Sequence, residues 1–598
     1  MSTTTLARTA ADAPRPPGPQ PRTGPAPLVA LGVATALWLW SLPRVDLGGL
    51  TDIGLVSALP LSFFAAVAVL TAGFFTELGR GEPRARLLWA YLVAAVVFLH
   101  GVVSVVEAVP RFPTSWIHAG FTDHIAEHNA TLPLLDARFS WPGFFTAAAL
   151  VERVAGLDSA LWFVRWSPVV FNLVALAPVA ILVRVADAEP RAHWTALWTF
   201  CVANWVGQDY FSPQALNFVL YAVILAVLLT WFRPTDTGRA PWLPGTGSLE
   251  VPVQPAGPGT RAALVVVVLA AFAASVVSHQ LTPFALVAAT AALVLGQRCV
   301  LRLLPVLFLA GALAWLSFAA EPYWRGHLAD VTGGIGRITG AIQSGVGQRL
   351  AGNDGHVFVI RLRVVAALAL WAVALVGAVR SYRRRRRVPW PHLLLMAAPF
   401  SLVALQSYGG EIMLRVYLLA LPFAALLAAL AFFPEKLAPG TRPGRGTMAV
   451  AAAASGAMAL SFLVVRYGNE RFESFTQDEV AAVEWVYENA PPRSRVVALN
   501  SSLPWRHRDI DTYSYIGSVP ANHLDEAHEV LDYMTTDDGR PGYLLITRSQ
   551  EAHGELIEGR PPGWTAEVEH LLASTGETVV AFRNRDAVVI HHPGGVSP

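Results

Sequence analysis

The sequence predicts an α-helical polytopic membrane protein of about 13 transmembrane helices, with a small α/β domain at its C-terminal end. Of its 598 residues, 54% are hydrophobic and only 14% are charged, whereas a soluble globular chain carries about 25% charged residues. Long apolar stretches recur along the chain and stop near residue 466, where a polar segment begins. So few charges cannot cover a surface in water, and lipid is the expected solvent.

Apolar stretches that approach the roughly 20 residues needed to cross a bilayer define the predicted spans. They lie at 28–43, 54–76, 87–109, 160–183, 194–206, 213–232, 262–278, 283–296, 303–319, 363–380, 390–407, 411–433 and 447–465. The fifth and eighth are short. Because polar ends can extend toward the headgroups, both are still counted as spans.

The distribution of arginine predicts the orientation of these spans. With the N-terminus inside, the inner segments hold 22 Lys and Arg residues, including the run Arg383–Arg387, and the outer segments between the spans hold 8. Cytoplasmic loops carry the excess of positive charge. We therefore expect a multi-pass protein of the cell membrane with a cytoplasmic N-terminus and an extracytoplasmic C-terminal domain.

The chain divides into three parts by composition. Residues 1–27, rich in Pro, Ala, Thr and Arg, are predicted to be a disordered cytoplasmic tail. The transmembrane domain covers 28–466 and has long outer loops at 110–158 and 320–362. In the extracytoplasmic α/β domain, 467–598, helical patterns occur at 478–489 and 564–573, and strand-like apolar runs occur at 495–499, 543–547 and 577–590.

Some functions are excluded by composition. A net charge of +2 is too small for a nucleic-acid-binding chain. Two cysteines, Cys201 and Cys299, form neither a disulfide framework nor a zinc site.

Polar residues of chemical interest gather at the outer ends of the spans, where an ionisable group is costly and usually has a partner or a function. Asp123 and Asp209 are the predicted catalytic residues. The predicted substrate-binding residues are His124, Gln208, Tyr210, His279, Gln280, Glu411 and Arg415.

Structural roles are open alternatives for several of these residues. Glu411 and Arg415 are four residues apart and are able to pair with each other on one helix face. His279 fits a satisfied buried histidine, and each aspartate fits a cap or a turn.

Three segments resemble the GT-C class of membrane glycosyltransferases. Phe121-Thr122-Asp123-His124 lies where that class has an acidic pair after an early span, and Ser140-Trp141-Pro142-Gly143 is similar to the aromatic-proline element that follows. The helix within Thr476–Pro491 is similar to the one that opens the outer domain of such enzymes. The chain departs from the class in having His124 as the second residue of the pair, and two additional spans before the motif.

The resemblance implies an enzyme that moves a sugar from a polyprenyl-phosphate donor to a glycan, lipid or protein acceptor of the cell envelope. Asp123 would take the acceptor proton, with Asp209 as the competing candidate, and Arg415 would stabilise the leaving phosphate. The alternative is a transporter or flippase for a lipid-linked or polar substrate. A transporter needs charged residues near the midplane, whereas here the polar groups cluster at one rim. A third reading is a non-catalytic scaffold that presents the outer domain.

No cofactor is predicted, because no set of His, Cys, Asp and Glu has convincing ligand spacing. A divalent metal is possible, since members of the resembling class that use pyrophosphate-linked donors often require one. Membrane lipid is an expected partner, and nucleic acid is not.

Overall fold

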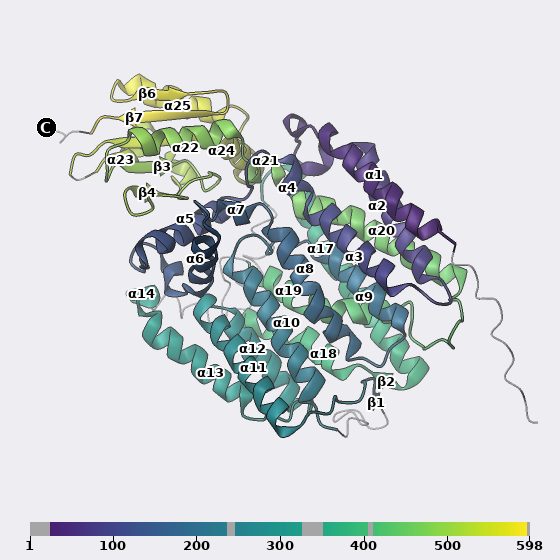
Figure 1. Cartoon of the computed structure of the whole chain (residues 1–598). Helices are drawn as coiled ribbons and strands as arrows, with labels where there is room; N and C mark the ends of the chain where they lie inside the picture. Colours follow the sequence, from purple (N-terminus) through teal and green to yellow (C-terminus); the bar gives the residue numbers. More distant parts are fainter. Residues whose placement is uncertain (1–23, 236–245, 326–350, 405–410, 537, 595–598) are drawn as a thin grey trace, which may run out of the picture.

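The structure, a computed structural model, describes residues 24–235, 246–325, 351–404, 411–536 and 538–594. It consists of a bundle of long helices that ends at Tyr467 and a smaller α/β domain that follows (Figure 1). Most of the predicted tail at 1–27 and much of the predicted loop at 320–362 lie outside the described residues.

A helix occupies each of the predicted spans. These helices are α1 (Ala26–Ser41), α2 (Leu61–Leu78), α3 (Ala85–His100), α8 (Ser167–Arg184), α9 (Pro190–Ala203), α10 (Pro213–Trp231), α11 (Pro258–Ser278), α12 (Thr282–Leu295), α13 (Leu304–Ala314), α17 (Asp354–Arg385), α18 (Trp390–Ala397), α19 (Ile412–Leu430) and α20 (Arg445–Tyr467). In the described part of the chain, 8 helices are long and apolar enough to cross a membrane, and several shorter apolar helices accompany them. The predicted fold class is confirmed, whereas the number of spans stays a prediction.

Prolines set the starts of several helices. The spans predicted at 54–76 and 160–183 begin later, at Leu61 and Ser167. Pro60 precedes the first of these helices and Pro168 occupies the first turn of the second. Proline lacks a backbone N–H and has a fixed φ, so it favours the beginning of a helix over its interior.

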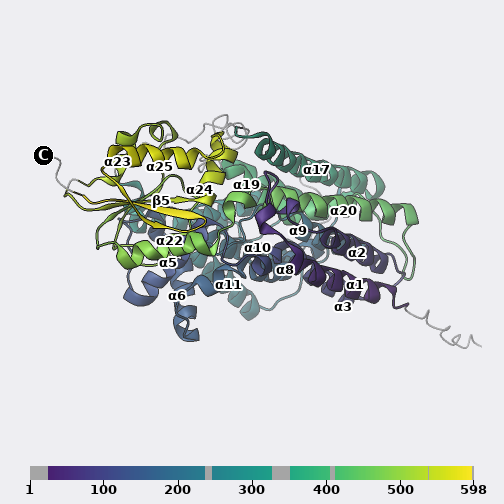
Figure 2. The ribbon, with the colours of Figure 1, turned by 90° about the horizontal axis from the view of Figure 1, so that it is seen from above.

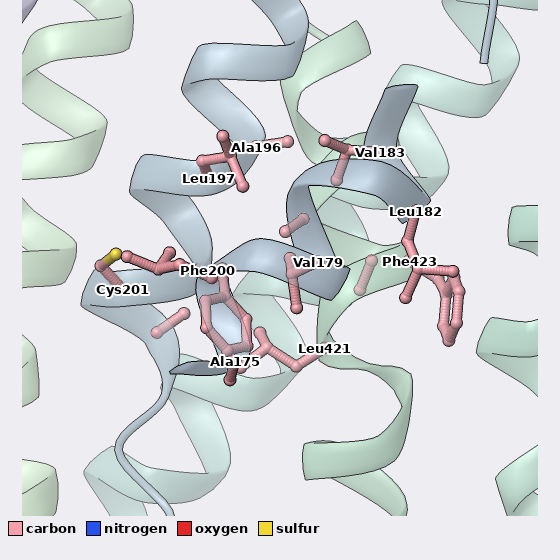
Figure 3. Packing of buried hydrophobic residues seen from close by; sticks show 14 of the residues in the cluster. Ala175, Val179, Leu182, Val183, Ala196, Leu197, Phe200, Cys201, Leu421 and Phe423 are labelled. Atoms are coloured by element: carbon pink, nitrogen blue, oxygen red, sulfur yellow. The ribbon is translucent and has the colours of Figure 1, made fainter. Parts of the chain in front are cut away.

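Helix α19 lies at the centre of the bundle, with 89% of its apolar window buried. Small residues allow its neighbours to approach closely, as is usual between helices in a membrane. A Cβ on Gly377 of α17 would lie 1.8 Å from the carbonyl oxygen of Leu427 in α19, so only glycine fits there. On the other side, Figure 3 shows Ala175 of α8 and Phe200 of α9 packed in an apolar layer with Leu421 of α19. The middle of the bundle is therefore dry at this interface.

The basic loops meet at the end of the bundle opposite the α/β domain. Arg191 donates hydrogen bonds to the carbonyl oxygens of Leu78, 3.0 Å away, and of Thr441, also 3.0 Å away. Strand β1 (Gly247–Ser248) pairs in parallel with β2 (Arg387–Val388), next to the arginine run. Figure 1 shows these two strands far from the C-terminal domain. The predicted grouping of loops is therefore present, and which end faces the cytoplasm stays a prediction.

Short helices cover the other end of the bundle. They are α4 (Val102–Val106), α5 (Pro113–His128), α6 (Gly143–Ala155), α7 (Leu161–Val164), α14 (Glu321–Trp324) and α21 (Glu470–Glu473). Figures 1 and 2 place α5 beside the C-terminal domain. A Cβ on Gly120 of α5 would lie 2.0 Å from the carbonyl oxygen of Arg506, and Trp116 packs edge-on against His507. Helix α5 is thus held between the bundle and the domain.

The C-terminal domain is a five-stranded sheet in the order β4-β3-β5-β7-β6. The strands are β3 (Arg495–Ala498), β4 (Ser514–Ile516), β5 (Gly542–Thr547), β6 (Val579–Arg583) and β7 (Ala587–His592); the helices are α22 (Gln477–Asn489), α23 (Ala527–Met534), α24 (Arg548–His553) and α25 (Trp564–Thr575). Strand β3 is parallel to β4 and β5, whereas β7 is antiparallel to β5 and β6. Alternate residues of the strands pack against α22 on one face and against α23 and α25 on the other.

Two strand predictions need correction. The run predicted as one strand at 577–590 is a hairpin, because the Asn584 side chain accepts hydrogen bonds from the backbone N–H groups of Asp586 and Ala587 and closes a turn. Strand β4 was not predicted, since its 3 residues are too few for a detectable alternation.

Candidate active site

A polar cavity of about 150 Å³ lies at the end of the bundle that faces the C-terminal domain. Its walls come from α5, the 138–145 turn and helix start, the loop before α10, the loop between α11 and α12, and the first turn of α19. The lining residues are Thr114, His118, Arg138, Trp141, Phe145, Tyr210, Ser212, Pro213, Gln214, Ser278, His279, Gln280 and Arg415. Segments far apart in the sequence therefore build one site.

Four of the predicted substrate-binding residues line this cavity: Tyr210, His279, Gln280 and Arg415. Glu411 lies just outside and accepts a hydrogen bond from Nη1 of Arg415 at 2.6 Å. The pairing of these two side chains on one helix face, which was the open structural alternative, is therefore present. It does not remove Arg415 from the cavity, which this residue lines with only 6% of its surface exposed.

The two histidines of the cavity are uncharged. Burial lowers the pKa of His118 to about 3, with help from the positive charge of Arg138. Burial also lowers the pKa of His279 to about 3, with help from Arg415. Both imidazoles are therefore neutral at physiological pH, so each has one ring nitrogen that donates and one that accepts.

Arg138 and Gln214 are site residues that sequence reasoning did not single out. Nε and Nη2 of Arg138 donate to the two carboxylate oxygens of Asp136 at 2.9 and 2.8 Å. Gln214 is 3% exposed, and within the described residues neither its amide nitrogen nor its amide oxygen has a hydrogen-bond partner. Both lay in segments rich in polar and aromatic residues at the outer rim, which was the available signal.

Asp209 is next to the cavity but is fully engaged. One carboxylate oxygen accepts from Arg466 at 2.7 Å, and the other lies 3.1 Å from Nδ1 of His100. Burial alone would raise the pKa of Asp209, but the positive charge of Arg466 and the hydrogen bond to His100 lower it below its ordinary value. This carboxylate is a stable anion and a weak base. Gln208, its neighbour, lines a smaller pocket with Asp209 and Asn172.

A second acidic group, Glu107, lies beside Asp209 in a narrow pocket that shares Tyr210 with the cavity. Glu107 is 4% exposed. Burial raises its pKa well above the ordinary value, and the adjacent carboxyl of Glu470 raises it further. Arg111 donates from Nε to Glu470 at 2.6 Å. Glu107 therefore combines access to a pocket with a raised proton affinity, as a general base requires.

Sequence reasoning missed Glu107 because the third span was predicted to reach residue 109. In the structure α3 ends at His100. The signal that was available is position, since Glu107 is the first acidic residue after that span.

The structure places Asp123 and His124 away from the cavity. Asp123 accepts hydrogen bonds from the hydroxyl of Ser159 and the backbone N–H of Ala160, both at 2.7 Å. Burial raises the pKa of Asp123, and burial together with Asp123 raises the pKa of Glu152 to about 7. His124 stacks on His128 with ring centroids 4.4 Å apart. Asp123 thus lies inside α5 and binds the backbone at the start of α7, which is a structural contact, and its catalytic role stays a prediction.

Metal binding also stays open. Within the described residues, one group with ligand atoms close enough to share a cation consists of Glu526, His528 and Glu529. These side chains are largely exposed on the C-terminal domain around α23, and none of them lines the cavity.

The fold and the site define a polytopic membrane protein with a buried polar cavity beneath an extramembrane α/β domain. No protein-family model matches the chain, and no curated protein matches it in sequence.

Solved structures with a similar arrangement of helices do exist. ArnT from Cupriavidus metallidurans, bound to undecaprenyl phosphate, has 13% identity and a TM-score of 0.47, with 84% of this chain and 98% of ArnT covered. The Archaeoglobus fulgidus oligosaccharyltransferase, tethered to an acceptor peptide, has 13% identity and a TM-score of 0.44, with 85% and 72% covered. The mycobacterial arabinofuranosyltransferase AftD has 13% identity and a TM-score of 0.46, with 86% and 42% covered.

These neighbours are GT-C glycosyltransferases, the class that the sequence resembles. Their TM-scores lie below 0.5, so the likeness does not assign an activity to this chain.

Proposed function

We propose that the protein is a membrane glycosyltransferase that transfers a sugar from a polyprenyl-phosphate donor to a hydroxyl of a cell-envelope acceptor on the outer face of the membrane. The observation that carries the proposal is that two pockets of different chemistry lie next to each other. A polar cavity with a buried arginine adjoins a pocket with a protonatable carboxyl, and Tyr210 lines both.

Arg415 is assigned to the donor phosphate. A guanidinium matches the geometry of phosphate oxygens, and stabilising the leaving group accelerates cleavage of the bond to the sugar. An apolar groove of about 140 Å³ between α17 and α19 supports a lipid donor, since it is lined by Leu368, Trp371 and Leu414. Leu414 lines the groove and directly precedes Arg415, which lines the cavity, so α19 contributes to both.

Glu107 is assigned the role of base, ahead of Asp123 and Asp209. Its carboxylate takes the proton of the acceptor hydroxyl as that oxygen forms a bond to the anomeric carbon. The bond between the anomeric carbon and the phosphate oxygen breaks at the same time, and its electron pair leaves with the polyprenyl phosphate. Asp209 is held by Arg466 and His100, and Asp123 binds the backbone at the start of α7, so neither is as well placed.

A transporter receives less support from the described residues. Transport requires polar groups along a path through the middle of the bundle. At that depth the helices α8, α9 and α19 meet through Val179, Phe200 and Leu421 (Figure 3). The buried charges described above lie instead at the two ends.

The test is sugar transfer by the full-length protein in lipid nanodiscs, with a radiolabelled polyprenyl-phosphate sugar and a membrane extract as the source of acceptor. Glu107→Gln keeps the shape of the side chain and removes the base, so we expect turnover to fall about 10²–10⁴-fold. Asp123→Asn is the matched comparison and should retain most activity while lowering thermal stability.

If Asp123→Asn loses turnover and Glu107→Gln retains it, the catalytic role returns to Asp123. No transfer by the unmodified protein from any polyprenyl-phosphate sugar would overturn the proposed function.

A further inference from the structure

The hydrogen-bonding capacity of the cavity wall identifies what kind of group it holds. His118 of α5 and His279 between α11 and α12 lie on this wall, together with Gln214 at the start of α10. All three side chains are at least nine-tenths buried, with 3%, 6% and 3% of their surface exposed. A polar side chain buried to this extent is costly unless it finds a partner.

The tautomer of His118 follows from its partner. Its Nδ1 lies 2.9 Å from the carbonyl oxygen of Phe211. A carbonyl oxygen only accepts, so Nδ1 carries the hydrogen, and in the neutral ring Nε2 is an acceptor. The described residues provide no hydrogen bond to that Nε2.

The tautomer of His279 is the opposite one. Its Nδ1 lies 3.2 Å from the backbone nitrogen of Leu281 and 3.1 Å from that of Thr282. A backbone N–H only donates, so Nδ1 accepts and the hydrogen sits on Nε2. No residue in the described part of the chain accepts from this Nε2.

The wall therefore offers a hydrogen-bond acceptor, Nε2 of His118, and a donor, Nε2 of His279. The amide of Gln214 adds one further acceptor and one further donor group. A hydroxyl group also both donates and accepts, so a set of adjacent hydroxyls is the natural complement. The rings of Trp141, Phe145 and Tyr210 supply apolar faces next to these groups. Adjacent hydroxyls together with an apolar ring face are the chemistry of a sugar.

Size and charge narrow the ligand further. The cavity has space for roughly ten water molecules, which is the scale of a single sugar ring. Of its two cations, Arg138 is held by Asp136 in a two-point contact, and Arg415, which also contacts Glu411, is assigned to the donor phosphate and not to the sugar. No described lining residue is a carboxylate. A charged sugar would therefore leave an unpaired charge in a buried site.

We infer that this cavity is the subsite for the transferred sugar and that it selects a neutral monosaccharide, whose hydroxyls bind to His118, His279 and Gln214. The inference rests on the proposed function only in stating that the bound sugar is the one that is transferred. Binding of a neutral sugar to this wall is testable without any transfer.

The binding test uses the full-length protein in nanodiscs and saturation-transfer NMR with three methyl glycosides: methyl glucopyranoside, its 2-amino analogue and the corresponding glucuronide. We expect the neutral glycoside to bind at least tenfold more tightly than the cationic and anionic ones. His118→Phe and Gln214→Leu keep side-chain size and remove hydrogen bonds, so each should weaken neutral binding about tenfold.

The matched control is His392→Phe. Like His118, His392 is buried and makes one hydrogen bond to a backbone carbonyl, that of Leu182 at 2.9 Å, but it lies in α18, outside the cavity. We expect this variant to lose stability and to keep sugar binding.

Three outcomes overturn the inference: no binding by any of the glycosides, binding of a charged glycoside as tightly as the neutral one, or neutral binding that survives both cavity substitutions. The transfer assay separates this inference from the proposed function. Efficient transfer of an aminosugar or a uronic acid would leave the glycosyltransferase in place and remove the neutral subsite. Selective neutral binding without transfer from any polyprenyl-phosphate donor would do the reverse.

Discussion

Both ends of the helical bundle contain buried polar groups, but these groups differ in how they are paired. At the basic end, Arg233 and Arg298 both lie within 3 Å of the buried carboxylate of Glu250, at 2.6 and 2.8 Å. At the opposite end, the amide of Gln214 and one carboxylate oxygen of Glu107 have no hydrogen-bond partner among the described residues. A satisfied ion cluster fixes structure, whereas unsatisfied buried groups beside a cavity indicate a ligand. A buried polar or charged residue in this bundle therefore indicates a ligand site only when its hydrogen-bond partners are known as well.

The comparison depends first on which end of the bundle faces the cytoplasm, and the largest expected effect is in a test of that orientation. Both native cysteines, Cys201 and Cys299, are buried, so they should not react with an impermeant maleimide. We expect a cysteine at Pro520 to be labelled from outside intact cells and one at Arg385 to be labelled only after permeabilisation. The reverse pattern would place the cavity in the cytoplasm and exclude an outer-face enzyme.

Substitution of Glu250 should have the largest effect on stability. Glu250→Gln leaves Arg233 and Arg298 with uncompensated charge in a buried site, which costs about 3–5 kcal/mol. Thermal unfolding in detergent, followed by size-exclusion chromatography, should show a clear loss of folded protein. The fraction that remains folded should retain its turnover per molecule, and a selective loss of donor affinity would contradict a purely structural role for this end.

At the cavity, Arg415→Lys should change function with little change in stability. Lysine keeps the positive charge but lacks the planar fork that binds two phosphate oxygens. We expect KM for the donor to rise about tenfold, with a melting temperature close to that of the unmodified protein. Full activity of Arg415→Ala would assign the phosphate to another residue.

The smallest expected effect is a pH dependence of stability that arises from the pair Asp123 and Glu152. The pKa of Glu152 is raised to about 7 in the folded protein from its ordinary 4.5, by burial and by Asp123. The folded state therefore binds the proton more tightly, so this stabilisation is complete below about pH 4.5 and is lost as pH rises through 7. The melting temperature should decline across this window, and Glu152→Gln should flatten the decline. An unchanged slope would mean that Glu152 ionises as it does in water.

The sequence was sufficient to predict the bundle, because apolar periodicity and arginine placement act within single segments. It also predicted part of the cavity, since Tyr210, His279 and Arg415 stand at span ends where polar residues are costly. The sequence did not reveal which carboxyl groups have their oxygens engaged in hydrogen bonds. The sequence placed Asp123 in an outer loop and Glu107 in a span, whereas the structure shows Asp123 bound to the backbone of Ala160 and Glu107 lining a pocket. Such distinctions depend on contacts between distant segments.

Helix α5 carries His118 into the cavity and also presses Gly120 against the carbonyl of Arg506. These two residues are separated by more than half of the chain, so ribosomes finish α5 long before its partner exists. All described lining residues of the cavity precede the C-terminal domain, but α5, which carries one of them, gains its contact with Arg506 only after that domain has been made. We expect a chain truncated before the domain to insert its helices in the membrane with α5 less firmly held.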